Sequence, residues 1–124
     1  MKTIVTLFAL IALAAAPASA QGVAGKWRAE FDTQVGAQKY LFTITQTGAS
    51  LTGAANAELG GEKRDVVLHD VKLKGDTLTF TETLDFQGNA VPITYTGLVA
   101  GEQISFTRQV GDFATEKFVA KREP

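Results

Sequence analysis

Polar and apolar residues alternate with a period of two from Gly25 almost to the end of the chain, and a glycine stands at every break in the alternation. Successive side chains of a β-strand point to opposite faces, so this period is typical of strands. No ten-residue stretch beyond Gly25 has the 3.6-residue spacing of an amphipathic helix. The alternation predicts eight strands, over residues 26–33, 38–46, 50–57, 64–73, 76–86, 90–99, 102–109 and 113–122.

The seven junctions between these segments are short and rich in glycine. They centre on Gly36, Gly48, Gly60-Gly61, Gly75, Gly88, Gly101 and Gly111. Short glycine loops are typical of hairpins, whereas parallel strands need long crossover connections. We therefore expect an all-β fold, an antiparallel eight-stranded up-and-down meander that forms a closed or nearly closed β-barrel. Closure removes the two exposed edge strands, and an open, strongly curled sheet is the alternative.

One face of the alternation is apolar and predicts the barrel interior, while threonine dominates the other face. The fourth strand departs from this pattern, because Val66 and Leu68 have one parity and Val71 and Leu73 the other, which predicts a bulge near His69-Asp70. The expected interior residues are Trp27, Phe31, Tyr40, Phe42, Ile44, Leu51, Leu78, Phe80, Leu84, Phe86, Val91, Ile93, Tyr95, Ile104, Phe106, Phe118 and Ala120.

The first twenty residues have the organisation of a secretory signal peptide. Lys2 precedes an uncharged apolar run over residues 4–16, and Ala18-Ser19-Ala20 has the small-x-small form of a cleavage site. The run is shorter than the roughly 20 residues that span a bilayer, so no stable membrane anchor is expected. We expect residues 1–20 to be removed near Ala20, and residues 21–124 to form a single domain that is periplasmic or secreted.

Composition argues against several classes of function. The chain has no cysteine and one histidine, His69, so thiolate chemistry and histidine metal cages are excluded, although carboxylates can still bind a hard cation. Its 12 Lys and Arg and 13 Asp and Glu are nearly balanced and form no basic run, which argues against a nucleic-acid partner. We expect no cofactor, no metal and a monomer.

Three charged residues, Glu82, Arg108 and Glu116, have the parity of the interior. With two-residue loops at Gly88-Asn89 and Gly101-Glu102, and a three-residue loop at 111–113, Phe86 pairs with Val91, Glu82 with Tyr95, Tyr95 with Arg108, and Arg108 with Glu116. The four polar residues then form one row across four strands. This row is either a charge-compensated floor or a ligand site in an apolar cup. The expected ligand-binding residues are Tyr40, Glu82, Tyr95, Arg108 and Glu116.

A catalytic role for the same row is the weaker hypothesis, and we expect no catalytic residue. A glycoside hydrolase would use Glu82 and Glu116, but three strand spacings place them roughly 14 Å apart. Catalytic carboxyl groups in such enzymes lie about 5 to 9.5 Å apart. The neighbouring His69 and Asp70 have no accompanying serine or cysteine nucleophile.

Short motifs resemble known families. Gly25-Lys26-Trp27 resembles the opening strand of lipocalin-like and avidin-like barrels, and this resemblance implies that an arginine from a late strand, Arg122 or Arg108, lies beside Trp27. A longer set resembles small bacterial secreted β-domains found alone or appended to glycoside hydrolases and esterases, which implies a carbohydrate-related accessory role. Its motifs are Gly25-Lys26-Trp27, Leu51-Thr52-Gly53, Gly75-Asp76-Thr77-Leu78-Thr79-Phe80, Tyr95-Thr96-Gly97 and Gly101-Glu102-Gln103-Ile104.

These observations predict an exported, non-catalytic binding protein for a carbohydrate or another small ligand. Most aromatic residues belong to the interior, so only Phe113 and Tyr40 are candidates for exposed stacking platforms. A glycan-active hydrolase and a solid-cored accessory domain that contacts a protein partner are the alternatives.

Overall fold

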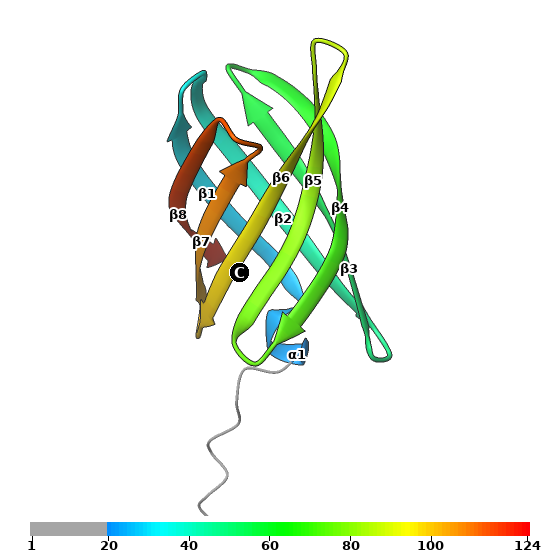
Figure 1. Ribbon diagram of the computed structural model, residues 1–124. Coiled ribbons are helices and arrows are strands. Elements are labelled where there is room, and N and C mark those ends of the chain that lie inside the picture. The colour runs from blue at the N-terminus through cyan, green and yellow to red at the C-terminus, as the bar shows by residue number, and fades with distance from the viewer. Residues whose placement is uncertain (1–19) are drawn as a thin grey trace, which may run out of the picture.

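The computed structural model describes residues 20–124, and the predicted signal peptide lies outside this range except for Ala20. Eight antiparallel strands form a closed barrel in sequence order, with β8 pairing back to β1 (Figure 1), so the predicted meander is confirmed. A short α1 (Ala20–Val23) precedes the barrel. The strands are β1 (Gly25–Thr33), β2 (Gly36–Thr47), β3 (Ser50–Leu59), β4 (Glu62–Lys74), β5 (Thr77–Phe86), β6 (Asn89–Ala100), β7 (Gln103–Val110) and β8 (Ala114–Arg122).

One predicted hairpin register is wrong by two residues. The β5–β6 turn consists of Gln87 and Gly88, both with positive φ (54° and 82°), and not of Gly88 and Asn89. Positive φ at both central residues suits the twist of a two-residue hairpin. Phe86 therefore faces Asn89, and Glu82 faces Ile93 in place of Tyr95. Because the shift is even, Glu82 keeps its inward direction.

The registers predicted for the last two hairpins are confirmed. Tyr95 faces Arg108, and Arg108 faces Glu116. The predicted bulge is also present: His69 pairs with Thr81 and Lys72 with Thr79, and Asp70 between them has a φ of 54°. The extra residue lets β4 point Val66 and Leu68, and then Val71 and Leu73, towards the interior despite their different parity.

Aromatic rings fill the middle of the barrel. The Phe31 and Phe118 rings stack with centroids 4.1 Å apart, and Phe80 and Tyr95 with centroids 4.8 Å apart. Gly97 makes this packing possible, because a Cβ atom there would lie 2.6 Å from the Phe106 ring. The predicted interior is confirmed with three differences: Leu51 and Leu84 are only half-buried, and Phe86 is exposed because it ends β5 beyond the packed rings.

The base of the barrel is closed by Trp27, Arg122 and α1. The Arg122 guanidinium lies 4.2 Å from the centroid of the Trp27 ring, so the residue beside this tryptophan is Arg122 and not Arg108. Trp27 Nε1 donates a hydrogen bond to the Val23 carbonyl at 3.0 Å. Arg122 donates to the carbonyls of Ala24, at 2.9 Å, and Gly22. The chain before β1 thus caps one end of the barrel.

The opposite end carries the β1–β2, β3–β4, β5–β6 and β7–β8 loops (Figure 1), and we call it the mouth. No helix within residues 20–124 has the length and apolar character needed to cross a membrane.

Candidate functional site

A hydrogen-bonded cluster of polar side chains lies between the aromatic core and the mouth, and Glu82 is at its centre. The Glu82 carboxylate is fully buried and accepts hydrogen bonds from the phenols of Tyr95, at 2.7 Å, and Tyr40, at 3.0 Å. Arg64 Nη1 also donates to it at 3.1 Å. A buried carboxylate needs such partners, because an unpaired charge away from water is costly.

Tyr95 reaches Glu82 although the two residues are not opposite each other in the sheet. Phe80 faces Tyr95 directly, and Glu82 is the next inward residue along β5. A tyrosine side chain is long enough to reach a diagonal neighbour. This reach explains why the wrong register still identified a correct pair of contacting residues.

Arg108 connects the centre of the cluster to its outer side. Its Nε atom donates to the Tyr95 hydroxyl at 2.8 Å, and its Nη1 atom donates to Glu116 at 2.5 Å. The guanidinium also lies 5.2 Å from the Phe31 ring centroid and 5.6 Å from that of Tyr40. Aromatic faces and a carboxylate together stabilise a cation that is almost completely buried.

Arg64 is a member of the cluster that the sequence interpretation missed. Its Nη2 atom donates to the Tyr40 hydroxyl at 3.0 Å, while Nη1 binds Glu82. The alternation of β4 could have identified this residue, because Arg64 lies two residues before Val66 and therefore on the same side of the strand as Val66 and Leu68.

The five predicted ligand-binding residues are brought together, and two arginines balance two glutamates in the cluster. Tyr40 is buried at its centre, so its candidacy as an exposed platform was wrong, while Phe113 is exposed as expected.

The environment fixes the protonation states of four members of the cluster. Burial first, and then the negative charge of Glu82, raise the pKa of Tyr95 well above 10 and raise the pKa of Tyr40 as well. Burial alone would lower the pKa of Arg108 and Arg64, but the neighbouring phenol and carboxylate oxygens outweigh it and raise both. The phenols therefore remain hydrogen-bond donors and the guanidiniums remain cations near neutral pH.

A pocket of about 440 Å³ opens at the mouth above this cluster. Arg64, Arg108 and Glu116 form the charged part of its surface, whereas Tyr40, Glu82 and Tyr95 lie beneath them and do not line it. The walls are mostly apolar, and their apolar residues are Leu59, Leu84, Val91, Val110 and Ala114. The uncharged polar residues Thr33, Gln34 and Gln38 also line the pocket.

The rim of this pocket carries three exposed apolar side chains from three different loops or strand ends. Val35 is 69% exposed, Phe86 52% and Phe113 68%. Large apolar side chains that gather around a pocket mark a binding surface more often than isolated ones do.

The site does not have the arrangement of a two-carboxylate hydrolase. Glu116 lines the pocket, but Glu82 lies behind Arg64 and Tyr40, so the two carboxylates do not face a common space. His69 is exposed at the bulge, outside the pocket. Within residues 20–124, no three His, Cys, Asp or Glu side chains are grouped so that they could hold a metal ion.

Comparison of the chain with protein-family models, with curated proteins and with solved structures gave no match. The geometry of the mouth therefore carries the functional inference.

Proposed function

We propose that this protein is an exported, non-catalytic binding protein that takes a carbohydrate or another small amphipathic ligand at the mouth of its barrel. The observation that carries this proposal is the pocket itself, in which mostly apolar walls surround a charged floor of Arg64, Arg108 and Glu116. Few, well-placed polar groups within apolar walls are the usual composition of a small-molecule site.

The floor is held in place before any ligand arrives. Arg108 is fixed by Tyr95 and Glu116, and Arg64 by Tyr40 and Glu82. A ligand therefore meets donors and an acceptor that lose little further freedom on binding, which favours affinity. Because the Arg64 side chain is 42% exposed, its guanidinium is the cluster's most accessible group for the polar end of a ligand.

The rim of the pocket offers a surface for the apolar part of the proposed ligand. Phe86 and Phe113 offer aromatic faces to solvent at the pocket's edge, where a sugar ring or an aliphatic chain can pack. The aromatic core below the cluster leaves the mouth as the place for such a ligand, which agrees with the way small eight-stranded barrels fill their interiors.

The test is a thermal-shift screen of residues 21–124 against oligosaccharides, fatty acids and small aromatic compounds, because a ligand specific for the folded state raises the melting temperature. For a compound that stabilises the protein, we expect Arg64→Ala and Phe113→Ala each to weaken binding roughly tenfold or more. Leu98→Ala is the matched control, since Leu98 is exposed on the outer face and lies outside the pocket. No stabilisation by any class, or equal effects of all three variants, would overturn the proposal.

A further inference from the structure

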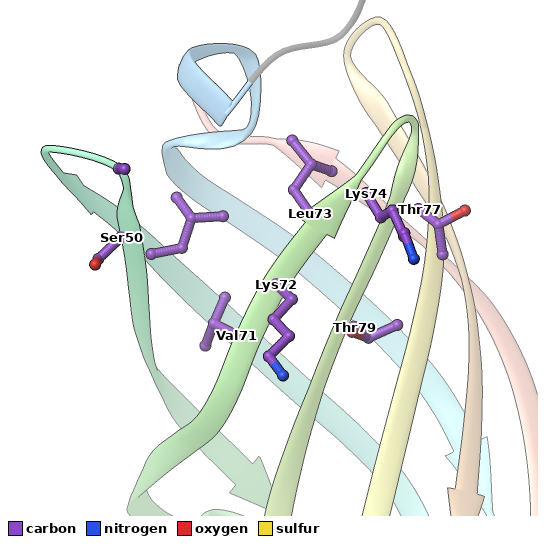
Figure 2. Close-up of a pocket in the computed structure, with 9 residues that line it drawn as sticks. Ser50, Val71, Lys72, Leu73, Lys74, Thr77 and Thr79 are labelled. Atoms are coloured by element: carbon purple, nitrogen blue, oxygen red, sulfur yellow. The ribbon is translucent and has the colours of Figure 1, made fainter.

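A second and larger hollow, of about 810 Å³, lies between β3 and β4 near the base of the barrel. Figure 2 shows Ser50 on β3 across the gap from Val71 and Leu73 on β4. Leu51, Val71 and Leu73 are at least partly buried and supply its apolar surface, while Lys72 and Lys74 are exposed beside it.

The hollow exists because the hydrogen-bonded ladder between β3 and β4 stops early. Its last pair towards the base is Gly53 with Leu68, and no pairs join residues 50–52 to residues 71–74. The bulge between His69 and Lys72 lies just beyond this point, where β4 leaves β3 and continues to pair with β5. On the other side of the gap, β3 keeps its pairing with β2 through Ser50 and Leu51.

Two strand edges therefore face each other across the gap without a strand partner. Each edge presents backbone N–H and C=O groups that an extended segment of another chain can use. Sheet edges of this kind bind peptides in the β-conformation, with alternate side chains pointing into the surface and away from it.

We propose that this gap binds an extended peptide segment in which apolar and acidic residues alternate. Apolar side chains of the segment pack onto Leu51, Val71 and Leu73, and the intervening side chains point outwards beside Lys72 and Lys74. Those lysines face Thr79 and Thr77 on β5. Neither lysine forms an ion pair within the described part of the chain.

The lysines determine which segments are accepted. Charged side chains at a strand edge discourage pairing with neutral or basic strands. Acidic residues at the outward positions convert this barrier into an attraction, so the gap selects by charge as well as by apolar pattern. The gap lies at the base, away from the mouth, and its function does not depend on ligand binding there.

The probe is a fluorescein-labelled peptide of alternating glutamate and valine, Glu-Val-Glu-Val-Glu-Val-Glu, measured by fluorescence anisotropy with residues 21–124. We expect saturable binding, with amide resonances of residues 50–52 and 71–74 shifting in two-dimensional nuclear magnetic resonance spectra. Backbone N-methylation of the valines or of the glutamates leaves every side chain in place but removes the N–H donors along one edge. At least one of the two methylated peptides should bind at least tenfold more weakly.

A charge-reversal pair tests selection by the lysines. Lys72→Glu combined with Lys74→Glu should weaken binding roughly tenfold at low salt. The matched control combines Lys117→Glu with Lys121→Glu, which are exposed on the outer face of β8. Absence of saturable binding at millimolar peptide, unchanged binding of both methylated peptides, or equal losses in the two double variants would overturn the proposal. If the first double variant does not fold, the methylated peptides and the wild-type protein decide the question.

Discussion

The guanidinium of Arg108 and the carboxylate of Glu116 form an ion pair between opposite residues of β7 and β8, at the floor of the mouth pocket. The arginine is almost completely buried, whereas the glutamate retains contact with the pocket. The pair therefore links the hydrogen-bonded cluster inside the barrel to the space in which we place the ligand, and its loss should affect both folding and binding.

Removal of Arg108 should destabilise the protein strongly. Arg108→Ala leaves Glu116 without its ion-pair partner and removes the donor to Tyr95, so we expect a loss of about 3–5 kcal/mol in the free energy of unfolding. Arg28→Ala is the control, because Arg28 forms its ion pair with Glu123 on the surface and should cost less than about 1 kcal/mol. Urea denaturation of both variants measures the difference, and similar small losses would contradict the burial of Arg108.

The two tyrosines of the chain, Tyr40 and Tyr95, both belong to the cluster, so tyrosinate absorbance reports on this site alone. Their pKa values are raised by burial and by Glu82. In the folded protein we expect no tyrosinate absorbance up to pH 10, where both side chains in the urea-unfolded chain are about half ionised. Ionisation of the folded protein near pH 10 would show that the phenols are accessible.

The same shift predicts how stability depends on alkaline pH. A raised folded-state pKa means that the unfolded chain loses its phenolic protons first, so the stabilising contribution is complete below about pH 10 and is lost as pH rises through the folded pKa. We expect the urea midpoint to fall above pH 10. Comparing the wild type with Tyr95→Phe isolates the effect, because the variant should have a shallower alkaline decline even though it is less stable at neutral pH.

Gly97 should not tolerate a side chain. A Cβ atom there would lie 2.5 Å from Ile104 and 2.6 Å from the Phe106 ring, so Gly97→Ala should destabilise the barrel by about 1–3 kcal/mol through overpacking. At Gly22, a Cβ atom would have no neighbour within 4 Å, and Gly22→Ala should have little effect. Thermal unfolding of the two variants tests whether the core is as tightly packed as the stacked rings indicate.

The β5–β6 turn gives a prediction that separates the two possible registers. Gln87 has a positive φ, which asparagine tolerates better, so Gln87→Asn should stabilise the protein by a few tenths to about 1 kcal/mol. Asn89 is already in β6, and Asn89→Gly should cost roughly 0.5–1 kcal/mol. Stabilisation by Asn89→Gly would instead favour the turn at Gly88 and Asn89.

Sequence alone predicted the strands, the direction of most side chains and the bulge, because period-two alternation follows directly from strand geometry. The position of Gly88 could not fix the turn, since both Gln87-Gly88 and Gly88-Asn89 contain the required glycine. Arg64 was missed because strand tilt and barrel closure determine which long side chains reach Glu82. The β3–β4 gap was missed for a related reason: the point where two strands separate depends on curvature and not on the pattern within either strand.

The contacts of Arg122 at the barrel's base join parts of the chain that are far apart in sequence. The hydrogen bonds from Arg122 to Ala24 and Gly22 span 98 and 100 residues. During synthesis, the hairpins can form one after another, but β1 has no second neighbour until β8 has been made. Contacts between distant residues slow folding, so closure of the ring should be the late step that determines how long β1 remains open to pairing with other chains.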